Sequence, residues 1–83
     1  MIRILMKIAH DDGTDETILV MTDFVTTNAD KSTLHVACKS KSLGSRHNFS
    51  IDARDEQSAS MLMHDMLTAG YVDATGYAAK REN

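Results

Sequence analysis

The chain has 83 residues, nine of them lysine or arginine and twelve aspartate or glutamate, so its formal net charge is −3. A chain of this length forms one small domain, 1–83, whose few apolar side chains are needed for the core, and this disfavours a deep catalytic cavity. The single cysteine, Cys38, excludes an internal disulfide and favours a reducing compartment. The first residues lack the apolar run of a signal peptide, and no stretch approaches the ~20 apolar residues that cross a bilayer. We therefore expect a cytoplasmic protein with no membrane partner.

Two strands are predicted at the start of the chain. Residues 2–9 place isoleucine or methionine at every even position, which is the period of a strand, and an aspartate-rich turn follows at 10–15. A second strand is expected over 17–27, where β-branched residues dominate. Its even positions, including Phe24, are assigned to one face and its odd positions, including Val25, to the other.

Two more strands are predicted in the middle of the chain. Residues 28–31 favour a short turn, and 33–40 alternate as a third strand. After a connection at 41–45, a short fourth strand carries His47, Phe49 and Ile51 on one face.

A helix is predicted over 52–71, the only stretch with a clear helical period. Its apolar stripe, which leaves Met61 outside, consists of Ala59, Leu62, Met63, Met66 and Leu67. Asp52 or Asp55 can cap its first turn, and Gly70 suits a left-handed C-terminal residue. From Val72 onward a final short strand or helical turn is expected, with 80–83 frayed. Together these elements predict an α+β fold, a four-stranded antiparallel β-meander with the helix packed on one face.

The first two predicted strands are apolar on both faces. A helix is about 10–12 Å across and covers two or three strands, spaced about 4.8 Å apart, on one side of a sheet only. The apolar residues left on the other side are Leu5, Leu19, Met21 and Val25. The C-terminal tail, a second copy of the chain in a homodimer or a foreign protein could cover them, and the sequence leaves these three alternatives open.

Basic residues gather in a stretch from 31 to 51 that contains no acid. Lys39 and Lys41 flank the tip of the predicted hairpin with Arg46 across from them, and Lys31 lies before it. Such a hairpin could stay solvated, meet an acidic surface of a partner protein or follow the phosphates of a nucleic acid. Aromatic support for nucleic acid is poor, because Phe24 and Phe49 are predicted to be buried.

No catalytic set and no metal site is predicted. His35 and Cys38 lie three apart on a strand and point to opposite faces, so they cannot chelate together. We find no zinc pattern, phosphate-binding glycine loop or nucleophile elbow. Cys38 is interpreted as a small buried hydrophobe, and the chain is expected to be non-enzymatic and without a cofactor.

A resemblance to a known family rests on the basic hairpin. Lys41-Ser42-Leu43-Gly44-Ser45-Arg46, followed by Phe49 and by Glu56-Gln57 at the start of a helix, resembles a stretch of small phage anti-CRISPR proteins that inhibit type I surveillance complexes. The closing Arg81-Glu82-Asn83 is also similar, and the likeness covers about a quarter of the chain, with a changed spacing between Arg46 and the helix. The resemblance implies a small sheet-plus-helix protein that binds Cas subunits, and no binding residue is carried over.

The sequence thus predicts a non-enzymatic inhibitor or adaptor of phage or mobile-element type that binds a bacterial protein complex. Its predicted polar contacts are Lys31, Lys39, Lys41 and Arg46. The alternative is a small nucleic-acid-binding or regulatory protein that uses the basic hairpin 31–47.

Overall fold

The computed structural model describes residues 1–40 and 45–82, with the side chains of 39, 40, 45 and 46 excepted. Within these ranges the elements are β1 (Ile2–Ala9), β2 (Asp15–Thr22), β3 (Phe24–Thr27), β4 (Thr33–Ser40), β5 (Ser45–Asp52), α1 (Glu56–Ala69), β6 (Tyr71–Asp73) and β7 (Ala78–Glu82). The predicted α+β class and the mainly antiparallel sheet are confirmed. The four-stranded meander is wrong, because the described residues form one seven-stranded sheet.

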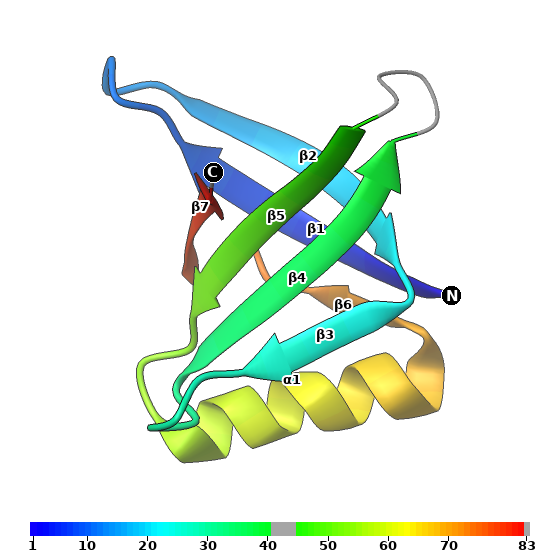
Figure 1. Cartoon of the computed structure of the whole chain (residues 1–83). Helices are drawn as coiled ribbons and strands as arrows, with labels where there is room; N and C mark the ends of the chain where they lie inside the picture. The colour runs from blue at the N-terminus through cyan, green and yellow to red at the C-terminus, as the bar shows by residue number, and fades with distance from the viewer. Residues whose placement is uncertain (41–44, 83) are drawn as a thin grey trace.

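The sheet rolls back on itself. Its strand order is β2-β1-β7-β5-β4-β3, and β6 pairs with β1 beside β7. The pairs that β1 makes with β6 and β7 are parallel, and the other pairs are antiparallel. Since only Asp23 separates β2 from β3, the two ends of this order belong to one bent ribbon. Figure 1 shows the result, with β4 and β5 crossing in front of β1 and β2.

The bend between β2 and β3 is fixed by Thr22, whose side chain is buried. The Thr22 hydroxyl accepts a hydrogen bond from the Phe24 N–H at 3.0 Å and donates one to the carbonyl oxygen of Ala37 on β4. Inward positions are even in β2 but odd in β3, so Val25 packs against the core whereas Phe24 is 63% exposed. The predictions that Phe24 is buried and that Val25 lies on the uncovered face are therefore wrong.

Helix α1 lies across one end of the rolled sheet rather than on the face of a flat meander (Figure 1). It begins after Asp55, whose carboxylate accepts a hydrogen bond from the Ser58 N–H at 2.7 Å. It ends at Gly70, where φ is 67° and the N–H donates to the Met66 carbonyl oxygen at 3.1 Å. Both predicted caps are confirmed, with Asp55 as the N-cap.

The predicted apolar stripe of α1 is confirmed except at its last residue, Leu67. Ala59, Leu62 and Met66 are buried, and Met63 is half-buried against them. Leu67, predicted to face the core, is 74% exposed, because the rolled sheet meets a narrower side of α1 than a flat one would. Met61 is exposed, as predicted.

The core fills the space between the two halves of the rolled sheet and α1. Its buried apolar residues are Ile4, Met6, Ile8, Val20, Leu34, Val36, Phe49, Ile51, Ala53, Ala59, Leu62, Met66, Val72, Ala74 and Ala79. β1 contributes Ile4, Met6 and Ile8 to this core, which it shares with β4, β5 and α1.

The C-terminal tail becomes part of the sheet. β6 runs parallel to β1, and β7 pairs antiparallel with β5 from Ala78 to Glu82. The predicted fraying from Lys80 onward is therefore wrong as far as Glu82, and Asn83 lies outside the described residues. Because the tail lies beside β1 in the plane of the sheet, it is not a layer over the outward face of β1 and β2.

Candidate interaction surface

Four apolar side chains gather on the outward face of β1, β2 and β6. Leu5 on β1 stands directly opposite Leu19 on β2, and Met21 follows Leu19 on the same face. Leu19 and Met21 are 53% and 56% exposed, whereas Leu5 is half-buried between its neighbours. Tyr71 joins them from β6 and is 40% exposed. We call Leu5, Leu19, Met21 and Tyr71 the outer apolar face.

Tyr71 is held in place by its neighbour on β1. Tyr71 stands in register with Arg3, whose guanidinium carbon lies 6.0 Å from the centre of the tyrosine ring. The ring quadrupole attracts the cation at this distance. One end of the outer apolar face is therefore amphipathic, as is common at protein-binding surfaces.

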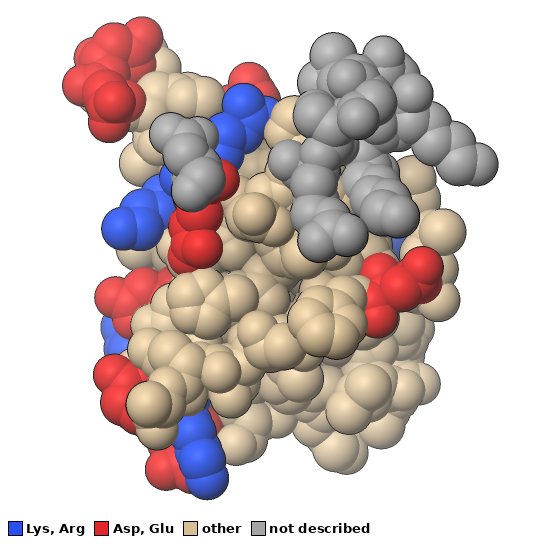
Figure 2. Space-filling view, viewed as in Figure 1, with Lys and Arg blue, Asp and Glu red and all other residues tan. Residues whose placement is uncertain are grey.

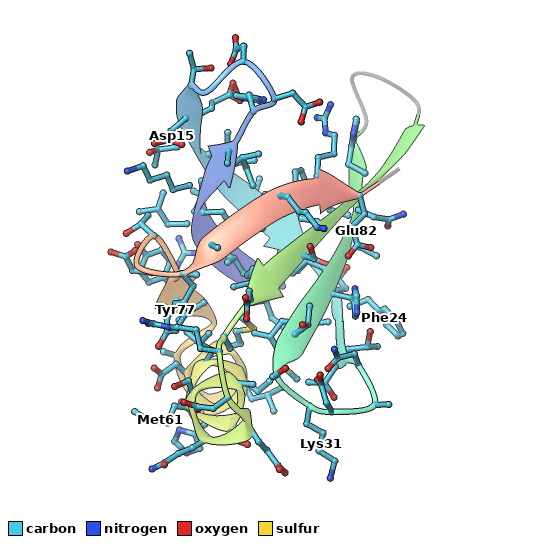
Figure 3. All side chains as sticks on the ribbon, turned by 90° about the vertical axis from the view of Figure 1, so that its left-hand side faces the viewer. Asp15, Phe24, Lys31, Met61, Tyr77 and Glu82 are labelled. Atoms are coloured by element: carbon cyan, nitrogen blue, oxygen red, sulfur yellow. The ribbon has the colours of Figure 1, made fainter. Side chains whose placement is uncertain are left out.

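The apolar surface continues from Tyr71 onto one side of α1. An open groove of about 390 Å³ lies there, lined by Met61, Leu62, Asp65, Ala69, Tyr71, Val72, Asp73 and Tyr77. The Arg54 guanidinium carbon lies 4.8 Å from the centre of the Tyr77 ring, which lines this groove. Figure 3 shows Tyr77 and Met61 on the same side of the molecule as Asp15, opposite to Phe24.

The predicted basic contacts do not form one cluster in the described residues. Lys31 lies in the turn before β4, with φ at 61°, and its ammonium group is 3.8 Å from Glu56. Lys39 and Arg46 are in register near the far end of β4 and β5. Lys39 lies six residues, or ~20 Å, along β4 from its first residue, Thr33. Their side chains and the whole of Lys41 lie outside the described structure. Lys31 is therefore separate from the hairpin end, and the nucleic-acid alternative stays a prediction.

A second open groove, of about 350 Å³, lies on the other side of α1. It is lined by Thr27, Lys31, Ala59, Ser60, Met63, His64 and Leu67. Lys31 and His64 lie among its lining residues, whereas the groove beside Tyr71 has Asp65 and Asp73.

An acidic turn stands at the other end of β1 and β2. The Asp12 carboxylate accepts hydrogen bonds from the Thr14 hydroxyl at 2.6 Å and from the Thr14 N–H at 3.0 Å, and these bonds lower the pKa of Asp12. The Lys7 ammonium lies 3.4 Å from Asp15. The turn is therefore ordered by its own hydrogen bonds, and one of its acids already has a cation.

The face opposite the outer apolar face is largely uncharged at its centre. Figure 2 shows the side of β3 and β4, where Lys, Arg, Asp and Glu lie toward the margins. The His35 Nδ1 atom is 2.9 Å from a Glu82 carboxylate oxygen, so this pair ties β4 to β7 across β5. Phe24 is the large exposed apolar side chain on β3.

Two observations bear on the predicted absence of a catalytic or metal site. Cys38 is only partly buried against the core, and burial raises the pKa of its thiol while the nearby Arg81 opposes the shift. A group of three or more His, Cys, Asp or Glu placed to hold a metal ion is not found within residues 1–40 and 45–82.

Sequence reasoning missed two exposed aromatic residues. Phe24 was assigned to the wrong face because alternation was carried through the bend at Asp23. Tyr71 was expected behind the capping residue Gly70, packed back on Met66, although Tyr71, Val72 and Asp73 alternate in exposure as a strand. The alternation of these three residues is too short to indicate a strand without its neighbour β1.

Comparisons with protein-family models, with curated proteins and with solved structures give no significant match for this chain. In the part of the chain that the structure describes, no helix has the length and apolar character needed to cross a bilayer.

Proposed function

We propose that this chain is a non-enzymatic, protein-binding inhibitor or adaptor whose contact surface is the outer apolar face. The observation that carries the proposal is the exposure of Leu19 and Met21 on β2, with Tyr71 on the same face across Arg3 of β1. An apolar cluster that a monomer leaves in water gains about 25 cal/mol for each Å² that a partner covers. The residue types fit this role, because tyrosine and methionine are enriched at the centre of protein interfaces.

The position of this cluster also supports binding. Strands hold side chains at fixed spacing, so little conformational entropy is lost when a partner docks on them. The groove beside Tyr71 adds a recess next to the flat face, and the Asp65 and Asp73 carboxylates stand at its rim. A partner that places an apolar side chain in the recess and a base beside it would fit both features.

The experiment is affinity capture from a bacterial lysate with matched variants. Tyr71→Lys puts a charge into the outer apolar face, whereas Leu67→Lys puts the same charge on an exposed position of α1 outside that face. We expect a protein that binds wild type and Leu67→Lys but is lost with Tyr71→Lys. Equal capture by all three variants would exclude the outer apolar face as the contact surface.

The narrower proposal is that the partner is a type I CRISPR surveillance complex of the host. It rests on the resemblance at 41–46, most of which lies outside the described residues. The test is phage plaquing on a strain whose type I system targets that phage, with and without the chain expressed. Restored plaquing that is lost with Tyr71→Lys and kept with Leu67→Lys would support both proposals. Unrestored plaquing across the type I subtypes would reject the narrower one alone.

A further inference from the structure

The outer edge of β2 presents main-chain groups to solvent. On β1, the Arg3 N–H donates to Gly70 O at 2.9 Å, and the Leu5 carbonyl oxygen accepts from the Ala74 N–H at 2.8 Å. Both bonds point away from β2, so the odd positions of β1 bond toward β6 and the even positions toward β2. In an antiparallel pair, residues directly opposite each other either both bond across the pair or both bond outward.

The register then assigns the outward groups of β2. Odd residues of β1 stand opposite odd residues of β2, including Lys7 opposite Thr17 and Leu5 opposite Leu19. The N–H and C=O groups of Thr17, Leu19 and Met21 therefore face the outer edge of β2, and those of Ile18 and Val20 bond to β1.

Strand pairing on that edge is not present within residues 1–40 and 45–82, where β2 pairs with β1 alone. The Thr22 hydroxyl reaches Ala37 on β4, and from there toward Asp15 the two strands diverge (Figures 1 and 3). An edge with unpaired donors and acceptors is a template for a further strand.

The sequence of β2 does little to discourage such pairing. Protective edge strands carry proline, lysine or an inward-pointing charge. Residues 17–22 contain none of these and read Thr-Ile-Leu-Val-Met-Thr, a combination of high β-propensity and no charge.

We propose that β2 pairs antiparallel with β2 of a second copy of this chain, about a two-fold axis at Leu19. Leu19 then faces the second copy's Leu19, and Thr17 faces the second copy's Met21. This register brings outward main-chain groups against outward main-chain groups, so each facing pair exchanges two hydrogen bonds. The pairing uses the main chain of β2, so it does not depend on the proposed function.

Charge at the ends of the strand does not prevent a second copy from pairing in this register. Asp15 would face the second copy's Asp23, which by itself would be repulsive. However, Asp15 has the Lys7 ammonium at 3.4 Å, and Asp23 has the N-terminal ammonium of Met1 at 3.7 Å. In each copy both acids therefore have a cation nearby. At the centre of the contact, Leu19 faces the second copy's Leu19.

The dimer would also extend the outer apolar face. Leu5 and Leu19 stand opposite each other in one copy, so two copies give a row of four leucines across four neighbouring strands. An edge contact buries less than the about 1,000 Å² of a stable interface. We therefore expect a weak dimer, with Kd between about 10 µM and 1 mM.

The test combines sedimentation equilibrium with amide hydrogen exchange at several protein concentrations. We expect dimers below about 1 mM and, as concentration rises, growing protection of the Thr17, Leu19 and Met21 amides. The Ile18 and Val20 amides should be protected at all concentrations because they bond to β1. A monomer at about 1 mM, or a dimer whose three outward amides exchange freely, overturns the proposal. Protection of those amides only by a foreign protein overturns it as well, in favour of a foreign strand on the same edge.

Two variants at one position separate the main chain from the side chain. Thr17→Pro removes an outward N–H without removing a bond to β1, and the solvent-facing side of an edge strand is a place where a sheet tolerates proline. It should raise the dimer Kd by at least about tenfold, equivalent to about 1.4 kcal/mol, while Thr17→Val leaves Kd unchanged. Retained protection of Val20 would show that Thr17→Pro is folded. An unchanged Kd in folded Thr17→Pro overturns the proposal, and Tyr71→Lys, which tests the proposed function, should leave Kd unchanged.

Discussion

The two halves of the rolled sheet differ in the polarity of the residues on their outward faces. In the half made of β4 and β5, inward positions such as Leu34 and Ile51 are buried, and outward positions such as His35 and Asn48 are polar. In the half made of β1 and β2, inward positions are buried just as well, but the outward positions include Leu5, Leu19 and Met21. A strand that is covered on one face only requires apolar residues on that face and not on the other.

The comparison separates residues that stabilise the fold from residues that the fold leaves exposed. Both halves contribute to one core, so we expect the exposed outward residues of β2 to add little to the stability of the isolated chain. Exposed apolar residues on a small domain carry a cost in solubility. Their clustering on β1 and β2, compared with the single Phe24 on β3, is the asymmetry that the proposed function addresses.

The largest expected effects test the inward faces of both halves. Ile4→Ala in β1 and Leu34→Ala in β4 each remove a fully buried side chain and should lower the free energy of unfolding by about 2–5 kcal/mol. Leu19→Ala, on the outward face of β2, should change it by no more than about 0.5 kcal/mol. Urea unfolding at a concentration where the chain is monomeric measures all three. A Leu19→Ala loss as large as that of Ile4→Ala would mean that the outward face is covered in the free protein, and the comparison would fail.

The next effect tests the junction between the halves. Thr22→Val keeps the shape of the buried side chain but removes the hydroxyl that bonds to Phe24 and to Ala37. Leaving these groups without a partner should cost about 1–3 kcal/mol in the free energy of unfolding. Thr26→Val, at an exposed position of β3, is the matched control and should be near neutral. Equal losses for the two variants would show that the bend is set by something other than Thr22.

Local sequence signals predicted most of the strands and the helix, but not that the sheet rolls back on itself. The caps at Asp55 and Gly70 and the alternation of β1 and β4 depend on neighbours within a few residues, and all of them are visible in the sequence. The roll depends on pairs such as Ile8 with Ala79, whose partners are far apart along the chain. No local pattern encodes such a pair, so a flat sheet under a helix was the simplest arrangement that buried the same residues.

The outer apolar face was predicted in part for the same reason. Leu5, Leu19 and Met21 were found because they break the alternation expected of half-buried strands. Val25 was included wrongly because the bend at Asp23 changes which positions face inward. Tyr71 was missed because β6 is short and is defined by its pairing with β1.

A smaller effect tests which half depends on α1. The helix packs against β1 and β6, so weakening it should loosen that half first. Asp55→Ala removes the N-cap bond to Ser58 and should cost about 1 kcal/mol. Amide exchange should then quicken in β6 more than in β4, whereas Asp65→Ala on the exposed side of α1 should alter neither. Equal acceleration in both strands would mean that the halves unfold as one unit.

The smallest effect compares one turn in each half at acid pH. Asp12, between β1 and β2, accepts bonds from the Thr14 hydroxyl and N–H, and Asp30, between β3 and β4, accepts bonds from the Ser32 N–H and hydroxyl. These bonds lower the pKa of both carboxyls below the ordinary value of 3.8. A lowered pKa in the folded state contributes stability that is fully present above about pH 4 and is lost as the pH falls through the folded pKa.

Asp12→Asn and Asp30→Asn should therefore each flatten the fall of unfolding free energy below about pH 4. The change should be small, because both carboxylates are exposed and screened by solvent. Carboxyl NMR titration checks the two pKa values directly, and urea unfolding between about pH 2.5 and 7 checks the slope. Because the same hydrogen-bonding motif stands in both halves, the two variants should behave alike. A difference between them would show that the turns, and not only the outward faces, distinguish the two halves.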